Sequence, residues 1–153
     1  LGLKDATGNI PRVSRLRRRL GDRFLLLSGD DPTQAAFRRA GGDGCISVTA
    51  NIAPALCAAL HRACDARNTV EIARFQRILA PLHAALFLQT NPIPLKRALC
   101  HLGLMSDGLR LPLTPLGPLD DQKLIHALEA VEMAERIIAP RFAASQPHQP
   151  RAA

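Results

Sequence analysis

The chain begins with Leu1-Gly2-Leu3-Lys4-Asp5-Ala6-Thr7-Gly8, an apolar run that ends in a lysine and passes into a polar turn. Such a run is typical of a strand that delivers one side chain to the rim of an α/β sheet. A lysine amine that is partly desolvated there can lose its proton and attack a carbonyl, whereas a guanidinium cannot. Two interpretations of Lys4 stay open on spacing alone: a Schiff-base nucleophile, or a lysine that ends a strand and points into water. The other lysines of the chain are Lys96 and Lys123.

Two more apolar runs follow, at residues 24–27 and 45–49, and their connections to the neighbouring segments are short. The pattern predicts a parallel α/β sheet whose strands are buried on both faces. Three such units cannot close a barrel, so we expect two exposed sheet edges. The turn at residues 28–32 (SGDDP) offers backbone N–H groups for a carboxylate or an oxyanion, or is an ordinary helix cap. Helical patterns cover residues 9–20, 32–40 and 53–66.

After Arg67 the pattern changes, because no further strand-like run occurs. The spacing of apolar residues predicts a helix over 70–88 with a kink at Pro81, and a proline-rich extended segment over 106–118. Residues 91–96 are expected to form a rigid bend that starts a helix to about Leu104, and a last helix is expected over 120–138 with Asp120 as its cap. We therefore expect an α/β part at residues 1–67, an all-helical part at 68–138, and a disordered tail at 139–153.

Composition narrows the class of protein. The chain has 153 residues, 47% of them hydrophobic but only 3% aromatic, so a globular fold with an aliphatic core is expected. The net charge of +7 suits anionic substrates. We interpret the arginines at 15–19 as a solvated helix face and expect no nucleic acid as partner, because no aromatic residues interleave with them. The chain does not begin with Met, which suggests a piece of something longer.

The cysteines and histidines show no metal-ligand spacing, so no metal site is expected. The cysteines are interpreted as reduced residues of a cytoplasmic protein, Cys57 and Cys64 sharing one face of a helix. The histidines are interpreted as packing or surface residues. No apolar run approaches membrane-spanning length, and no membrane partner is expected.

Several blocks, taken together and in order, resemble the 4-hydroxy-tetrahydrodipicolinate synthase (dihydrodipicolinate synthase) family. They are residues 2–9 (GLKDATGN), 27–31 (LSGDD), 41–51 (GGDGCISVTAN), 79–83 (LAPLH), 91–96 (NPIPLK) and 109–115 (LRLPLTP). The resemblance implies a TIM barrel, that is a (β/α)₈ barrel, followed by a C-terminal helical region. This chain would carry the last three strand–helix units of that barrel and the helical region.

The resemblance also implies an activity, the condensation of pyruvate with L-aspartate 4-semialdehyde on the diaminopimelate route to lysine. Lys4 matches the family's Schiff-base lysine, and Gly29 and Ile46 match positions that shape the pyruvate pocket. The family is cytoplasmic, needs no cofactor, and is commonly homotetrameric. Asp30 and Asp31 lie at the rim of the pocket without an assigned role.

The chain departs from the family in several ways. Asp5 stands where Glu is usual, Cys45 where Val is common, and Arg97 where Trp is frequent. The family's proton-relay tyrosines and threonine, and the arginine that binds the aldehyde substrate's carboxylate, belong to the first five units, and this chain contains no tyrosine. We therefore expect the 153 residues alone to be inactive. Two alternatives stay open: another pyruvate-dependent lyase, of the N-acetylneuraminate lyase or sugar-acid aldolase type, or a non-catalytic truncated stub.

Overall fold

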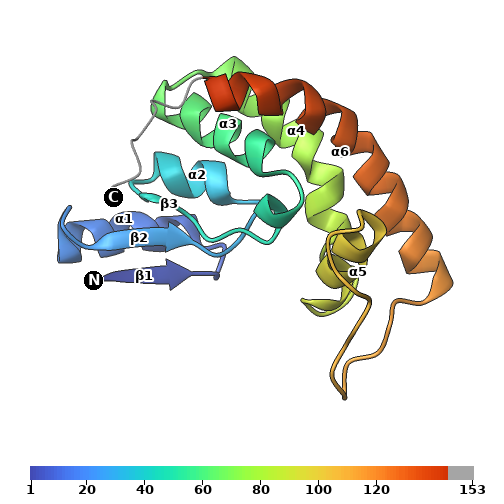
Figure 1. The fold of residues 1–153 in the computed structure, drawn as a ribbon. Coiled ribbons are helices and arrows are strands. Elements are labelled where there is room, and N and C mark those ends of the chain that lie inside the picture. Colours follow the sequence, from blue (N-terminus) through green and yellow to red (C-terminus); the bar gives the residue numbers. More distant parts are fainter. Residues whose placement is uncertain (145–153) are drawn as a thin grey trace, which may run out of the picture.

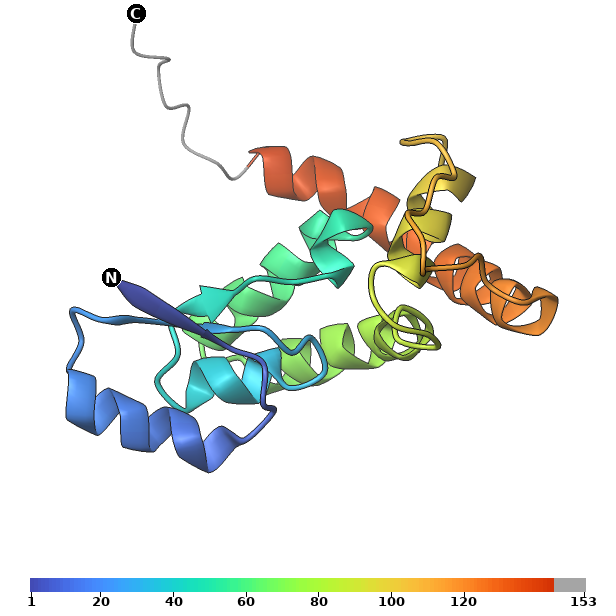
Figure 2. The ribbon, with the colours of Figure 1, turned by 90° about the horizontal axis from the view of Figure 1, so that it is seen from below.

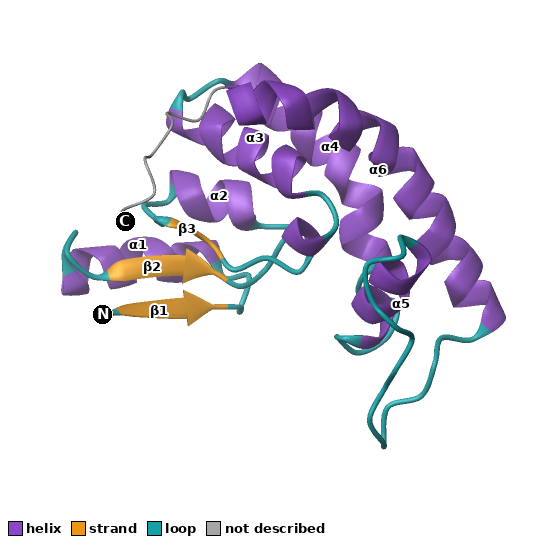
Figure 3. Cartoon of the chain, viewed as in Figure 1, coloured by secondary structure: helices purple, strands orange, loops and turns teal. Residues whose placement is uncertain are grey.

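The computed structural model describes the backbone of residues 1–144 and the side chains of residues 1–140. Three strands, β1 (Gly2–Asp5), β2 (Leu25–Ser28) and β3 (Gly44–Cys45), form one sheet in that spatial order (Figure 1). All pairings are parallel, so the carboxyl ends of the strands meet at one edge (Figure 3). The predicted parallel α/β arrangement is confirmed.

Helices α1 (Ile10–Leu20) and α2 (Gln34–Arg39) pack against one face of this sheet. The Asn9 side chain accepts a hydrogen bond from the Arg12 N–H and caps α1, as the sequence predicts. Val13, Leu26 and Phe37 form the small buried core between helices and sheet. The other face is uncovered in the described part of the chain, and Leu25 on it is 51% exposed. The expectation of strands buried on both faces is therefore wrong for this chain.

The third strand is much shorter than predicted. Residues 45–49 were expected to be extended, but β3 ends at Cys45, and a 3-10 helix, η1 (Thr49–Asn51), follows. The carboxylate of Asp31 accepts hydrogen bonds from the N–H groups of Val48 (2.9 Å) and Thr49 (3.1 Å). These donors are therefore directed to a side chain instead of a neighbouring strand, which ends the ladder.

The rest of the chain is helical: α3 (Pro54–Asp65), α4 (Thr69–Ala85), α5 (Ile93–His101) and α6 (Pro118–Ala144). Seen from two directions, α1 and α5 lie at opposite ends of the molecule (Figures 1 and 2). Leucines of α3, α4 and α6 form a second, larger core, in which Leu56, Leu60, Leu79, Leu82 and Leu124 are fully buried. The aliphatic core expected from the composition is confirmed.

Several boundaries in the helical part differ from the sequence prediction: α4 ends at Ala85 and α5 at His101, each earlier than predicted, and α6 differs at both ends. Helix α6 begins at Pro118, so Asp120 lies in its first turn and pairs with Lys123 (3.2 Å). The same helix continues past Ile138 to Ala144, so residues 139–144 are not a disordered tail. The remainder of that predicted tail lies outside the described residues. Helix α4 runs through Pro81, where the kink stays a prediction.

Candidate active site

Lys4 lies at the carboxyl end of β1, beside Leu27 of β2. Side chains alternate between the two faces of a strand. Leu3 and Asp5 therefore face the helices, while Lys4 stands on the uncovered face and is exposed. The expected position at the rim of the sheet is confirmed.

Gly29 follows β2 directly and lies against the stem of Lys4. A Cβ atom at Gly29 would lie 2.6 Å from Cε of Lys4, 3.0 Å from its Cγ and 2.9 Å from Cβ of Ala6. Real Cβ atoms do not approach other atoms this closely, so a larger residue here would displace the lysine. Glycine thus allows the lysine side chain to cross the end of the neighbouring strand.

Ile46 completes the same edge of the sheet. Its N–H donates to the carbonyl of Ser28 (2.8 Å), and its side chain is 48% exposed. Cys45 pairs with Ser28 in the sheet, so Ile46 projects beyond β3 on the same face as Lys4. The structure therefore brings Lys4, Gly29 and Ile46 to one edge, on an open surface.

Asp5 fixes the end of the strand that carries Lys4. Its buried carboxylate accepts hydrogen bonds from the N–H (2.9 Å) and hydroxyl (2.6 Å) of Thr7 and from Nε of Arg12 (2.8 Å). Burial acts to raise the pKa of Asp5, but the Thr7 and Arg12 contacts outweigh it and leave the pKa below its ordinary value. In the sequence, Asp5 stands out only as a departure from the family; its closeness to Thr7 and Gly8, as in an Asx turn, was the available signal.

Asp31 supports the segment that follows Ile46. This residue is 2% exposed, and its carboxylate accepts hydrogen bonds from the Ser47 hydroxyl and from the backbone N–H groups of Val48 and Thr49, which follow β3. Asp30 instead binds the N–H (3.2 Å) and hydroxyl (2.5 Å) of Thr33 in its own turn. The sequence assigned no role to either aspartate, because the partners of Asp31 lie far along the chain.

Two N–H groups of the turn at residues 28–32 are already engaged within the chain. The N–H of Gly29 donates to the Asp5 carbonyl (2.8 Å), and the N–H of Asp30 donates to the Ser28 hydroxyl (3.2 Å). The Asp30 carboxylate accepts from the Thr33 N–H just before α2, but Thr33, the N-cap residue of α2, makes no side-chain cap hydrogen bond, so both interpretations stay open. Lys4 is the side chain at this edge that suits covalent chemistry with a carbonyl.

The other nucleophile near the site is inactive at neutral pH. Burial, with the Asp31 carboxylate nearby, raises the pKa of the Cys45 thiol to about 12, so it stays protonated. All four cysteines are free, and Cys57 and Cys64 are buried as predicted. No group of three or more His, Cys, Asp or Glu within the described residues is arranged to hold a metal ion.

The histidines of the described chain pack or face solvent, as the sequence predicts. His61 contacts Oε1 of Gln34 through Nε2 (2.9 Å), and burial lowers its pKa. Burial also lowers the pKa of His83. His101 and His126 are exposed, and His148 lies outside the described residues.

The parallel strand–helix units, with a lysine at the carboxyl edge of the sheet, define part of an α/β enzyme fold whose reactive groups lie at the strand ends. The sequence matches the dihydrodipicolinate synthetase family over residues 1–131. The chain belongs to that family. No helix of residues 1–144 combines the length and the apolar character needed to cross a membrane.

Named relatives agree with this assignment. The chain is 48% identical over 133 residues to a 4-hydroxy-tetrahydrodipicolinate synthase of Parvibaculum lavamentivorans, and 47% identical over 130 residues to one of Marinobacter nauticus. Each match covers 85% of this chain, but only 45% and 44% of the respective relative. The chain thus spans about half the length of the curated relatives it matches.

Solved structures of the same family also superpose on this chain. The synthase of Methylacidiphilum fumariolicum SolV superposes with a TM-score of 0.85 at 36% identity, covering 92% of this chain and 47% of that one. The chloride-inhibited synthase of Acinetobacter baumannii, in complex with pyruvate, has a TM-score of 0.81 at 40% identity, covering 86% of this chain and 45% of that one. The predicted fold family is confirmed at the level of an α/β fold with three parallel strands and accompanying helices.

Proposed function

We propose that this chain is the C-terminal part of a 4-hydroxy-tetrahydrodipicolinate synthase and that Lys4 forms the Schiff base with pyruvate. The observation that carries the proposal is the contact between the Lys4 stem and Gly29 beside Ile46, at the carboxyl edge of the sheet. The pyruvate complex of the Acinetobacter relative supports the choice of substrate. Gly29 and Ile46 would shape the pocket that receives pyruvate.

The chemistry requires an unprotonated amine at Lys4. Its nitrogen attacks the pyruvate ketone, and the resulting carbinolamine loses water to give an iminium ion. The iminium withdraws electrons, so the adjacent methyl group loses a proton and becomes an enamine carbon. That carbon attacks the aldehyde of L-aspartate 4-semialdehyde, a carbon–carbon bond forms, and the aldehyde oxygen takes up a proton. The amino group of the bound semialdehyde then attacks the new iminium carbon, which closes the ring, and the lysine amine leaves as the cyclic imine product forms.

The described residues supply the nucleophile but not the groups that move protons. The uncovered sheet face and the exposed Lys4 leave the reacting atoms open to water. Loose geometry and solvent access both reduce the rate of such a reaction steeply. We therefore propose that the 153 residues alone are inactive, and that a longer polypeptide supplies the other strand–helix units and the relay.

The organisation of that longer protein is part of the same proposal. Residues 1–67 would be the last three units of its barrel, and residues 68–138 its C-terminal helical region. By resemblance to the family, it would be a cytoplasmic homotetramer that needs no cofactor. The helix α6 and its core contacts with α3 and α4 support a helical region packed directly on the last barrel unit.

An activity assay on the polypeptide that contains this chain tests the proposal. We expect consumption of pyruvate with L-aspartate 4-semialdehyde, loss of that activity in Lys4→Arg, and retention in Lys96→Arg, because Lys96 binds the Gly108 carbonyl away from the strand ends. Cleavage of N-acetylneuraminate or another sugar acid in place of this condensation would favour the aldolase alternative. An upstream stop codon, with no turnover of either substrate, would favour the truncated stub.

A further inference from the structure

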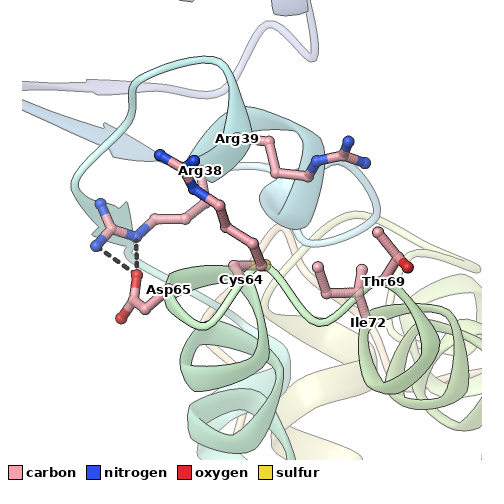
Figure 4. Close-up of a pocket in the computed structure, with 7 residues that line it drawn as sticks. Arg38, Arg39, Cys64, Asp65, Thr69 and Ile72 are labelled. Carbon is pink, nitrogen blue, oxygen red and sulfur yellow. Dashed lines mark hydrogen bonds and ion pairs between the residues drawn. The ribbon is translucent and has the colours of Figure 1, made fainter.

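A basic cavity of about 360 Å³ lies between the end of α2, the end of α3 and the start of α4 (Figure 4). Its charged and polar lining consists of Arg38, Arg39, Asp65, Arg67 and Thr69. Helix α2 ends at Arg39, and the chain returns from there to the start of β3. The cavity is therefore at the amino-terminal edge of the sheet, opposite the edge that carries Lys4.

One arginine of the cavity is neutralised within the chain. Nη2 of Arg38 lies 2.6 Å from Oδ1 of Asp65, and the same guanidinium donates to the Gly42 carbonyl. Figure 4 shows this side chain turned towards Asp65, while Arg39 extends over the side where Thr69 and Ile72 lie. Asp65 is the one carboxylate in the lining, and Arg38 already occupies it.

The other two arginines keep their charge uncompensated. Within residues 1–140, neither Arg39 nor Arg67 makes an ion pair, although seven other basic side chains do. The nearest acid at the start of α4, Glu71, is engaged by Arg74 (3.3 Å). Two guanidiniums around one cavity repel each other, and a bound anion would relieve that repulsion.

Arg67 has an unusual backbone conformation that sets its side chain at the cavity. Its φ is 53°, in the left-handed region where the residue after a helix is usually glycine. The N–H of Asn68 reaches back to the Ala63 carbonyl (2.9 Å), and the N–H of Arg67 to the Cys64 carbonyl (3.1 Å), which closes α3. An arginine at this position is less favourable than glycine for the backbone alone.

The rest of the lining suits the organic part of a ligand. Cys64 and Ile72 are buried and apolar, and burial raises the pKa of the Cys64 thiol, so it stays neutral. Thr69 adds a hydroxyl at the first residue of the 17-residue helix α4. The positive end of that helix adds to the potential of the two arginines.

We propose that this cavity binds the phosphate group of a small phosphomonoester, with the forked guanidiniums of Arg39 and Arg67 as the main donors. Guanidinium geometry matches phosphate oxygens in a bidentate way. The volume leaves room beyond one phosphate, and the Cys64 and Ile72 surface would contact the organic group. The site is separate from the Lys4 edge and does not depend on the proposed reaction.

Calorimetric titration of the polypeptide that contains this chain tests the site, with phenyl phosphate and inorganic phosphate as probes. We expect saturable binding of both, with phenyl phosphate the tighter. The double variant Arg39→Gln/Arg67→Gln should bind about tenfold more weakly or worse, since two charge-assisted contacts are lost. The matched control, Arg77→Gln/Arg110→Gln, removes the same charge from two other exposed arginines and should bind like the wild type.

The possible results distinguish a specific phosphate site at Arg39 and Arg67 from nonspecific attraction of anions to a basic protein. No saturable binding, or equal weakening in both double variants, would overturn the proposal. Arg39→Lys/Arg67→Lys keeps the charge but not the fork, so binding between that of the wild type and the Gln variant supports the assigned geometry. Far-ultraviolet circular dichroism checks that each variant is folded before titration.

Discussion

The position of the Lys4 side chain depends on a residue of the neighbouring strand end. Gly29 has no side chain, and the space a Cβ would take is filled by the Lys4 stem. The placement of Lys4 at a strand end was predictable from the run at residues 1–8. The contact with Gly29 was not, because it depends on the register between β1 and β2.

Gly29→Ala should move the lysine without unfolding the chain. The added methyl group would meet Cε of Lys4, and the amine would move from its place at the carboxyl edge of the sheet. We expect the rate of imine formation with pyruvate to fall at least tenfold, since small displacements of a reacting group cost this much. Gly117→Ala is the control, because nothing lies within 4 Å of the place that its methyl group would take. Equal rates in Gly29→Ala and wild type would contradict the account.

Asp43 makes the fold sensitive to acid. Its carboxylate accepts a hydrogen bond from the Leu26 N–H (2.7 Å) and pairs with Arg17. Burial acts to raise the pKa of Asp43, but the Leu26 hydrogen bond and Arg17 outweigh it, and the pKa lies below the ordinary value of 3.8. Arg17 also donates to the carbonyls of Gly41 (2.9 Å) and Gly21 (2.8 Å). The sequence-based interpretation of the arginines at 15–19 as a solvated helix face is therefore wrong for Arg17.

The sign of the pH effect follows from that lowered pKa. The folded state holds the charged carboxylate, so Asp43 stabilises the fold above about pH 4, and the contribution is lost as the pH falls through the folded-state pKa. In Asp43→Asn, the free energy of unfolding should therefore fall less steeply between about pH 5 and pH 2 than in the wild type. Urea unfolding at several pH values measures it. Parallel pH profiles would show that Asp43 does not carry this effect.

At the scale of elements, the sequence predicted most of the order correctly. The alternation of apolar runs with helical patterns identified β1, β2 and the helices, and the caps placed α1 well. The prediction was wrong for β3. An apolar run does not reveal whether its backbone N–H groups donate to a neighbouring strand or to a side chain such as the Asp31 carboxylate. The prediction also ended α6 too early, because a proline does not always end a helix, and this one runs through Pro140 to Ala144.

Glu135 joins two elements that are distant in sequence. Its carboxylate, on α6, accepts hydrogen bonds from the N–H groups of Ala55 (2.7 Å) and Leu56 (2.8 Å) in the first turn of α3. The N-cap residue of α3 is Ala53, which makes no side-chain cap hydrogen bond. A charge from α6 therefore takes the place of a local cap.

Glu135→Gln should destabilise the helical part. The amide keeps one acceptor but loses the charge at the positive end of α3, and we expect a loss of about 1 kcal/mol in the free energy of unfolding. Glu129→Gln is the matched control, because Glu129 is exposed on the same helix. Urea denaturation measures both. Equal midpoints of urea unfolding for Glu135→Gln and the control would show that Glu135 does not stabilise the start of α3.

In the described chain, the three-stranded sheet has one exposed face and two exposed edges. One face is covered by α1 and α2, while the face with Lys4 and Leu25 is open, and β1 and β3 are unpaired edges in the described chain. Exposed edges and apolar strand faces favour association with other chains. The length of the match, about half of each relative, fits a sheet that further strands complete.

The 153-residue chain by itself should therefore self-associate as its concentration rises. Leu25→Lys places a charge on the open face of the central strand and should reduce association. Leu119→Lys is the control, because Leu119 is 74% exposed on α6, away from the sheet. Size-exclusion chromatography with light scattering follows the mass. A wild-type chain that stays monomeric at all concentrations would contradict the open-sheet account.

Reduction with borohydride in the presence of pyruvate, followed by peptide mass analysis, shows directly which lysine forms the Schiff base. The chain has three lysines, and each can be scored in the same digest. In the polypeptide that contains this chain, we predict one stable carboxyethyl addition, on Lys4, and none on Lys96 or Lys123. Addition at another lysine, or none at all, would contradict the assignment of Lys4 as the Schiff-base residue.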